Sequence, residues 1–433
     1  MMRFGLLLWL CLSGMQLAQA VPAIQTASLD NGLKIMLIEA HNVPMVAMQL
    51  SMPAGSRFDP QGRAGTASML ASMLSDHTAK HDDKAWAEWL DAEALRLGSG
   101  ANRDILSLSL TTLKESLPIG LDAFAEALLQ PGWNKKRFKL LQEDAVSGAI
   151  KSQEEPGVRA GDATAALLYG KHGYGHRAGG TAESLAKISL NDLKSLYAAQ
   201  SKPMGSVLAI SGDITMDEVL ALLKPRLQAW QGAPRTAALA VATPSVVKGQ
   251  KQSIVMPTTQ TLVQFSRLGI TRSDADFFPL FVMNHLLGGG GFGSKLMEEV
   301  REKRGLVYGV YSYFMPLAAP GPFVITLQTR ASQAAQAAQV VSDVMQALAD
   351  GHVDDKHVQA TKANLIGGFA QRMDSNRERV GLMAMIGFYQ MPLDYLQRWT
   401  EQVESVTVAD VKRVAAAYLQ PSDWNMIQVG PQE

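Results

Sequence analysis

The chain has 433 residues, and its 40 basic and 40 acidic side chains leave no net charge at pH 7. We find no stripe of Lys and Arg interleaved with aromatic residues, which argues against a nucleic-acid partner. The length suffices for two or more domains of ordinary size, and beyond the first 20 residues nothing predicts a membrane-spanning helix.

The first 20 residues have the pattern of a secretory signal peptide. One basic residue, Arg3, precedes an apolar run at residues 4–12, and the small residues Ala18 and Ala20 end the segment. The single cysteine, Cys11, lies inside it, so the mature chain has no thiol for a disulfide, a zinc site or a nucleophile. We therefore expect export, with a periplasmic destination in a Gram-negative host.

Two segments of the chain match each other in one register. Residues 188–212 align without a gap to residues 406–430, and each copy has a capping box, a helix, a proline break and an apolar strand. The identities kept in register include Asp192 with Asp410, Lys194 with Lys412, Pro203 with Pro421 and Gly212 with Gly430. This match predicts an internal repeat.

The fronts of the two halves also correspond. Apolar strands at residues 46–52 and 261–268 are each followed by a loop and an apolar helix, near residues 65–75 and 277–287. We therefore predict an α+β fold with two copies of one module, each a mostly antiparallel mixed sheet with helices on one face. Further helices are expected at residues 85–95, 117–129, 134–152, 333–350, 357–372 and 376–390. The Pro/Ala-rich stretch at residues 228–245 marks the linker, which gives a first domain at 21–230, a linker at 231–250 and a second domain at 251–433.

Residues 288–314 form a Gly-rich turn, a charged helix and an aromatic strand in sequence. The glycines leave the backbone free to take positive φ and to approach a neighbouring segment, and Ser294 can cap the helix. A helix is predicted at 295–304 with Gly305 as its stop, and a strand at 306–314. Arg301 near the helix end and Tyr308 just inside the strand could then face one cavity. The alternative is a solvated helix face followed by an ordinary half-buried strand.

The 288–314 segment resembles the second-domain segment of the pitrilysin and insulinase metallopeptidases, which include mitochondrial processing peptidase. There an Arg and a Tyr seven residues apart hold the peptide backbone, which implies the same role for Arg301 and Tyr308. The glycines expected to contact substrate are Gly288, Gly289 and Gly290. The resemblance covers nearly the whole mature chain and implies two sheet-and-helix domains that face each other as a clam shell.

The family's first domain carries an inverted zinc motif, H-x-x-E-H, with a distant Glu as third ligand. In this chain Ser68 and Ser72 stand at the two His positions, Ala71 at the general base and Ala149 at the third ligand. A serine hydroxyl is not an ordinary zinc ligand, and alanine cannot take a proton from a metal-bound water. The resemblance therefore implies that this chain has no catalytic metal.

Two histidine pairs offer an alternative metal site. His77 and His81 lie four residues apart in a polar run with Asp76, Asp82 and Asp83, for which we expect a solvated loop. His172 and His176 lie in a Gly-rich loop that relatives also carry, and we expect them to shape a turn.

Residues 98–110 read as a strand with a small, polar start and an alternating Leu/Ser run. Relatives pair an extended peptide with the edge strand at this place, which implies that Ala101 and Asn102 contact substrate. The alternative is an interior strand with no ligand.

Two functions follow. In the first, the chain is a noncatalytic subunit of a heterodimeric zinc peptidase: a sister with an intact H-x-x-E-H holds the zinc, while this chain binds peptide and supplies Arg301 and Tyr308. In the second, it is a structural or peptide-binding protein without chemistry. No cofactor is expected in this chain in either case.

Overall fold

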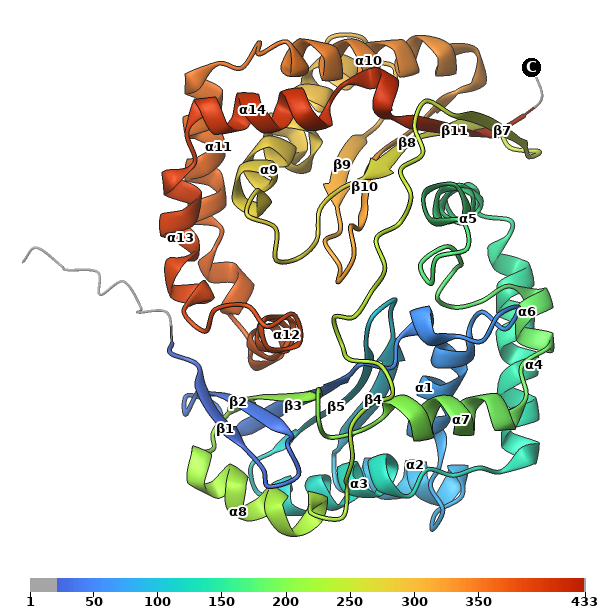
Figure 1. The fold of residues 1–433 in the computed structure, drawn as a ribbon, viewed down its shortest axis with the longest axis vertical. Helices are drawn as coiled ribbons and strands as arrows, with labels where there is room; N and C mark the ends of the chain where they lie inside the picture. Colours follow the sequence, from blue (N-terminus) through green and yellow to red (C-terminus); the bar gives the residue numbers. More distant parts are fainter. Residues whose placement is uncertain (1–21, 432–433) are drawn as a thin grey trace, which may run out of the picture.

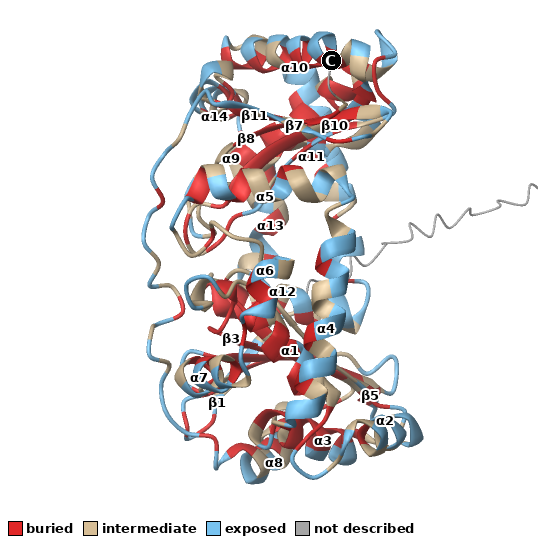
Figure 2. Cartoon of the chain, turned by 90° about the vertical axis from the view of Figure 1, so that its right-hand side faces the viewer, coloured by how far each residue is buried: buried red, intermediate tan, exposed pale blue. Residues whose placement is uncertain are grey.

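The computed structural model describes residues 22–431, so the predicted leader, with Arg3 and Cys11, lies outside the described residues. Two mixed sheets face each other, each with a layer of helices on its outer side (Figure 1). Buried residues concentrate on the sheets and on the helix sides that face them (Figure 2). Among the helices of residues 22–431, none is both long and apolar enough to cross a membrane.

The first sheet has six strands in the order β1-β2-β6-β3-β5-β4. Its strands are β1 Gln25–Ser28, β2 Lys34–Glu39, β3 Met45–Met52, β4 Arg96–Ala101, β5 Leu106–Leu113 and β6 Val207–Gly212. Only β2 and β6 pair in parallel, and β4 forms one edge. One hydrophobic core joins this sheet to α1 Thr66–Asp76, α2 Asp83–Ala92, α3 Leu117–Leu129, α4 Lys135–Ser152, α6 Ala182–Ala186, α7 Leu190–Gln200 and α8 Met216–Leu227.

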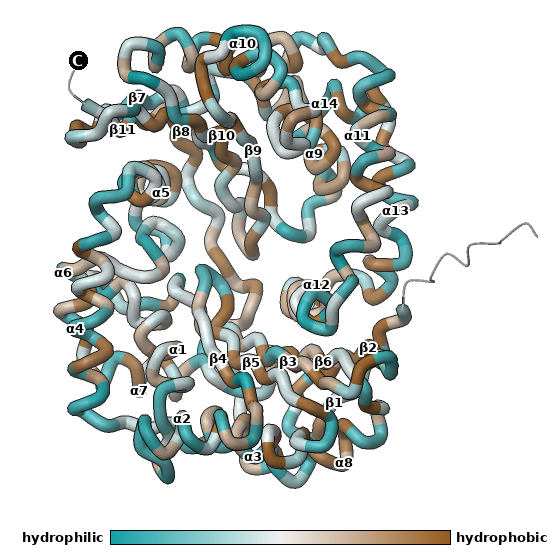
Figure 3. Tube along the Cα trace, turned by 180° about the vertical axis from the view of Figure 1, so that it is seen from behind, coloured by the Kyte–Doolittle hydropathy of each residue, from teal (hydrophilic) through white to brown (hydrophobic). Residues whose placement is uncertain are grey.

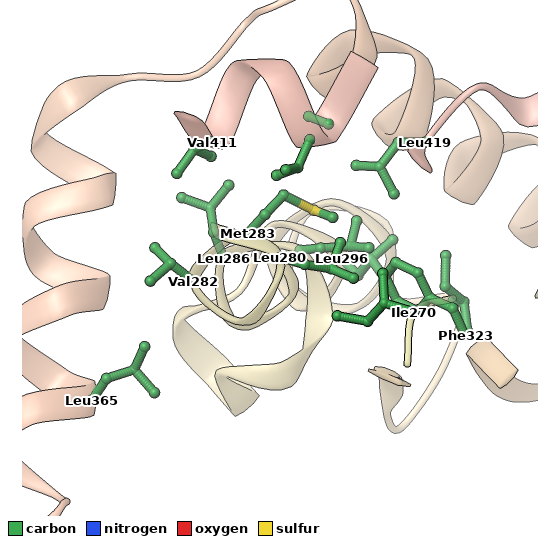
Figure 4. Close-up of a cluster of buried hydrophobic side chains, with 14 of the residues drawn as sticks. Ile270, Leu280, Val282, Met283, Leu286, Leu296, Phe323, Leu365, Val411 and Leu419 are labelled. Atoms are coloured by element: carbon green, nitrogen blue, oxygen red, sulfur yellow. The ribbon is translucent and has the colours of Figure 1, made fainter. Parts of the chain in front are cut away.

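The second sheet has five strands in the order β7-β11-β8-β10-β9. Its strands are β7 Lys251–Val255, β8 Gln260–Leu268, β9 Val310–Phe314, β10 Pro322–Arg330 and β11 Asn425–Gly430, and only β7 and β11 pair in parallel. Its helices are α9 Phe277–Asn284, α10 Ala334–Ala349, α11 Asp355–Gly367, α13 Tyr395–Ser405 and α14 Val408–Tyr418. Leu280 and Met283 of α9 fill the space between Val411 of α14 and the sheet (Figure 4).

The segments that match in sequence occupy equivalent places in the two sheets. Strand β6 pairs in parallel with β2 and antiparallel with β3, and β11 pairs in the same way with β7 and β8. Both capping boxes form, at Ser189 with Asp192 and at Thr407 with Asp410. The expected α+β class with two similar domains is confirmed.

Each sheet is also covered on its inner side by a helix from the other half of the chain. Helix α5, Pro156–Tyr169, lies against β8 and β11, and α12, Asn376–Phe388, lies against β2, β3 and β6 (Figures 1 and 3). The Gln264 amide donates to the Thr164 hydroxyl at 2.6 Å, and the Asn376 amide donates to the Met45 carbonyl at 3.3 Å. This exchange of helices interlocks the two halves and was not predicted from the sequence.

Two glycines of α12 allow a matched test of this packing. A Cβ at Gly387 would lie 2.5 Å from the Met36 sulfur and 2.6 Å from a Val207 methyl carbon, whereas a Cβ at Gly381 would meet nothing within 4 Å. We expect Gly387→Ala to lower the free energy of unfolding by about 1–3 kcal/mol, because it overpacks the core. We expect Gly381→Ala to raise it by up to about 1 kcal/mol through helix propensity. Urea unfolding measures the free energy of unfolding of both variants. Equal changes in the two variants would show that α12 does not pack against the first sheet.

Candidate functional site

Helix α1 carries the positions of the lost zinc motif. Ser68 donates a hydrogen bond to the Ala178 carbonyl at 3.1 Å, and Ser72 donates one to the Ser68 carbonyl at 3.2 Å. Ala71 is 3% exposed. Helix α4 packs against α1 and carries Ala149, which is also buried. Both hydroxyls are therefore engaged with backbone carbonyls, and alanine methyl groups occupy the other two positions.

Residues 22–431 contain no group of three or more His, Cys, Asp or Glu side chains placed to hold a metal ion. The donor set on α1 and α4 consequently does not fit a catalytic zinc, which needs three protein ligands and an open position for water.

The start of α1 depends on a buried carboxylate. Asp59 accepts hydrogen bonds from the Gly65 N–H at 2.7 Å and the Ala67 N–H at 2.8 Å, which satisfies donors that the first helical turn leaves free. Burial raises the pKa of Asp59 to about 7, although the backbone donors act in the opposite direction. A carboxyl group at this helix start is therefore partly protonated near neutral pH.

This raised pKa predicts a pH dependence of stability. Because the folded pKa exceeds the unfolded value of 3.8, the folded chain holds the proton between these values, and stability falls as pH rises from 3.8 through about 7. The loss amounts to roughly 4 kcal/mol at most. We expect Asp59→Asn to remove this part of the dependence. Urea unfolding across that range checks it, and parallel pH profiles for both proteins would contradict it.

The run that contains His77 and His81 is a loop with Lys80 and Asp82 exposed, as expected, but the expectation of a solvated loop is wrong for His77. His77 is 3% exposed, its Nδ1 lies 2.8 Å from Asp76, and its Nε2 accepts from the Asn134 N–H at 3.3 Å. The His81 ring stacks on Trp89 with centroids 5.0 Å apart. Burial of His77 depends on α4, which is distant in sequence, so the polar local pattern did not reveal it.

His172 shapes a turn, as expected. Its Nδ1 accepts from the Tyr174 N–H at 3.0 Å, and its Nε2 lies 2.9 Å from the Ala242 carbonyl oxygen. The His176 Nδ1 lies 3.1 Å from the Arg177 carbonyl oxygen in the same loop.

The helix predicted at 295–304 is present as a helical run at 295–302, but the Gly-rich segment before it is not the expected turn. Helix α9 continues into a π-helix at His285–Gly289, and a second π-turn, Met297–Glu302, includes Arg301. Of the glycines at 288–293 only Gly291 has positive φ, so this expectation is wrong for Gly288, Gly289 and Gly290. The close approach is real at Gly288, where a Cβ would lie 2.8 Å from the Ser312 nitrogen.

Tyr308 lies before strand β9 and not inside it, because the strand begins at Val310. Its side chain is 89% exposed and lines a cavity of about 410 Å³ on the second sheet, together with Tyr311 and Leu262. Leu262 packs with Ala160 of α5, so this cavity lies on the inner face of the sheet.

Arg301 is not among the residues that line this cavity, so the expectation of one shared cavity is not met in the single chain. Its guanidinium lies over the Phe292 ring, 4.7 Å from the centroid. Within residues 22–431, neither the Arg301 guanidinium nor the Tyr308 hydroxyl has a hydrogen-bond partner. Both therefore remain free to donate to a ligand.

Residues 98–110 are a hairpin and not one strand. Strand β4 ends at Ala101, a turn follows, and β5 begins at Leu106. The Asn102 side-chain oxygen accepts from the Asp104 and Ile105 N–H groups and so forms the turn, while the residue itself is exposed.

The β4 edge is nevertheless open. The Asn102 N–H donates to the Ile105 carbonyl at 2.9 Å and therefore points toward β5. Backbone N–H and C=O groups of successive residues point to opposite sides of a strand, so those of Leu97, Ser99 and Ala101 point away from β5. In the part of the chain that the structure describes, those outward groups have no partner. A cavity of about 610 Å³ lies over the inner face of the sheet, between β4 and the start of α12, and β5 forms its floor.

Beside this edge, Asp104 joins the two halves of the chain. It is fully buried and accepts from the hydroxyls of Tyr174 and Tyr389, the latter at 3.0 Å, and from the Ala318 N–H at 3.0 Å. The Arg57 Nε lies 3.6 Å from the same carboxylate. Asp104 was not predicted from the sequence, because all of these partners lie far away along the chain.

The fold and the altered metal positions define a two-domain, peptidase-like α+β chain. Residues 34–159 match the family model described as Insulinase (Peptidase family M16), and residues 187–365 match the one described as Peptidase M16 inactive domain. The chain belongs to peptidase family M16.

Three relatives illustrate the likeness. A solved structure of a peptidase M16 inactive domain from Pseudomonas fluorescens is 32% identical, with a TM-score of 0.90 over 95% of this chain and 98% of that one. A Helicobacter pylori chain named non-peptidase homolog YmxG is 24% identical over 89% of both chains. A Mycobacterium leprae chain named an uncharacterized zinc protease is 23% identical over 90% of this chain and 87% of its own length.

Proposed function

We propose that this chain is a noncatalytic subunit of a heterodimeric M16 metallopeptidase, which binds peptide and supplies Arg301 and Tyr308 to a zinc-bearing sister. One observation carries the proposal. Serine and alanine occupy all the metal and base positions, at Ser68, Ala71, Ser72 and Ala149, while the Arg301 and Tyr308 donors are unused in the single chain.

Peptide binding would use the open edge of β4. The unpartnered backbone groups of Leu97, Ser99 and Ala101 can add a strand, and main-chain hydrogen bonds give affinity with little demand on sequence. The cavity over the inner face of the sheet reaches β4 at Arg96, Leu97 and Gly98, so inward side chains of an added strand would lie beside it. This supports an extended peptide as the ligand.

In the assembled pair, zinc held by the sister would activate the attacking water. Tyr308 would donate its phenol O–H, and Arg301 its guanidinium N–H groups, to the carbonyl oxygen of the bound peptide. These hydrogen bonds would strengthen as negative charge develops on that oxygen. The high exposure of Tyr308 supports a donor that becomes enclosed only when the sister closes over it.

The second candidate function is a peptide-binding protein without any part in catalysis. It is favoured by the position of Arg301 outside the cavity that Tyr308 lines, and by the name non-peptidase homolog of the Helicobacter pylori relative.

The experiment compares this chain, a sister chain with an intact H-x-x-E-H, and their mixture in a peptide-cleavage assay with and without a chelator. We expect chelator-sensitive cleavage that is much faster in the mixture than with either chain alone. Chelator-sensitive cleavage by this chain alone would overturn the proposal. A sister whose rate is unaffected by this chain would favour the second function.

We also propose that residues 1–20 direct export to the periplasm, because they have the signal-peptide pattern. N-terminal sequencing of the chain from a periplasmic extract should begin at Val21. Recovery of the intact leader from the cytoplasm alone would contradict this.

A further inference from the structure

A cavity of about 440 Å³ lies between the two halves, at the end of the open β4 strand. Ala101, at the end of β4, forms part of its wall, so a strand added along β4 would lead directly to it. The loop between β9 and β10 and the middle of α12 complete the wall from the second half, at Pro316, Leu317 and Met385.

Two arginines, Arg103 and Arg272, line this cavity, and each has a buried Nε with no hydrogen-bond partner. Among residues 22–431, neither guanidinium takes part in an ion pair, and no Asp or Glu lines the cavity. Burial lowers the pKa of Arg272. The buried Nε of Arg57 also has no hydrogen-bond partner, but Arg57 differs in forming an ion pair, with its Nε 3.6 Å from the Asp104 carboxylate.

Aromatic rings hold both guanidinium groups without satisfying their N–H donors. The Arg103 guanidinium lies 5.8 Å from the Tyr169 centroid, and that of Arg272 lies 5.5 Å from Phe277 and 5.7 Å from Tyr389. A ring face attracts the cation but leaves the in-plane N–H edges unused. Those edges match a carboxylate, which accepts two parallel N–H groups from a guanidinium.

We propose that this cavity is a subsite for the carboxylate of an acidic side chain in the peptide that lies along β4. The inference rests on the proposed peptide binding at β4. An acidic residue near the Ala101 end of the added strand would reach the cavity, and its carboxylate would replace the missing partners of Arg103 and Arg272. The subsite would therefore select peptides with Glu or Asp at one end of the bound segment.

The test measures peptide binding to the full mature chain by fluorescence anisotropy. A set of labelled octapeptides carries a single Glu at successive positions, and each is paired with a peptide that has Gln at the same position. We expect at least tenfold tighter binding of the Glu peptide when the residue lies near one end of the bound segment, and no preference elsewhere. The tenfold preference should disappear in Arg103→Gln and Arg272→Gln.

Arg235→Gln is the matched control, because Arg235 is an exposed arginine on the linker that does not line the cavity. It should keep the preference, and thermal unfolding should show that all three variants remain folded. If a variant fails to fold, Arg→Lys at the same position retains the positive charge but not the two parallel N–H donors of the guanidinium. It should still weaken the preference for the Glu peptide.

Equal affinity for Glu and Gln peptides, or a preference that survives in both cavity variants, would overturn the subsite. Failure of every peptide to bind would overturn both the subsite and the β4 edge. Stabilisation by free glutarate without any advantage of the Glu peptides would assign the cavity to a small dicarboxylate and also overturn the proposal. The anisotropy assay measures binding and not cleavage. If the mixture with the sister did not cleave peptide, the proposed catalytic role would be overturned, but the subsite would not.

Discussion

Tyr308→Phe and Arg301→Ala are each expected to slow peptide cleavage by the assembled pair about 100-fold to 1,000-fold, the usual cost of one lost oxyanion donor. Each change removes hydrogen-bond donors that have no partner in the single chain, so neither should unfold the protein. The measurement is kcat/KM of the mixture at saturating sister chain.

Two control variants separate this effect from a general loss of charge or hydroxyl. Arg304 lies three residues after Arg301, but its guanidinium binds Glu299 at 2.7 Å, so Arg304→Ala should change the rate little. Tyr418 lies at the end of α14, whose core contacts are on the outer side of the second sheet, so Tyr418→Phe should also change it little. Full activity of both site variants would refute the role of the pair.

The same variants should behave differently when this chain is alone. Tyr308 is then hydrated, and a hydrogen bond that competes with water contributes little. We therefore expect unchanged peptide affinity for Tyr308→Phe in the single chain and a large rate loss only in the assembled pair.

Asp104→Ala is expected to lower the free energy of unfolding by about 3–5 kcal/mol, because it leaves the Arg57 guanidinium buried without its carboxylate. The Tyr174 and Tyr389 hydroxyls and the Ala318 N–H lose an acceptor at the same time. Urea unfolding at neutral pH measures the change. Because these partners come from both halves, linker proteolysis should also accelerate.

Asp122→Ala is the matched control. Asp122 is a mostly exposed carboxylate that accepts from Arg226 at 2.7 Å, and removal of such a surface pair should cost less than about 1 kcal/mol. An effect at Asp104 no larger than this would show that the buried cluster does not hold the halves together.

Much of the fold could be predicted from local patterns. Helix α3 has the predicted bounds, and the capping boxes at Ser189 and Thr407 begin α7 and α14 as expected. These features depend on residues three or four positions apart, which a sequence displays directly. Helices α5, α8 and α13 were not predicted, and the exchange of α5 and α12 between the halves depends on contacts distant in sequence.

The candidate site was predicted less well because it depends on backbone detail. The π-turn around Arg301 and the late start of β9 at Val310 have no periodic signal, so Tyr308 was placed inside the strand. The turn residues Asn102 and Asp104 did offer a signal for the β4–β5 hairpin, which the alternating Leu/Ser pattern obscured. The cavity that Arg103 and Arg272 line is formed by residues from both halves of the chain, so local patterns could not predict it.

The most direct test of the account is the zinc content of the purified mature chain after incubation with zinc and removal of free metal. The sister chain with an intact H-x-x-E-H serves as the positive control. We expect no bound zinc in this chain and a stoichiometric amount in the sister, because Ser68, Ala71, Ser72 and Ala149 provide no ligand. Stoichiometric zinc in this chain, lost together with peptide cleavage on chelation, would contradict it.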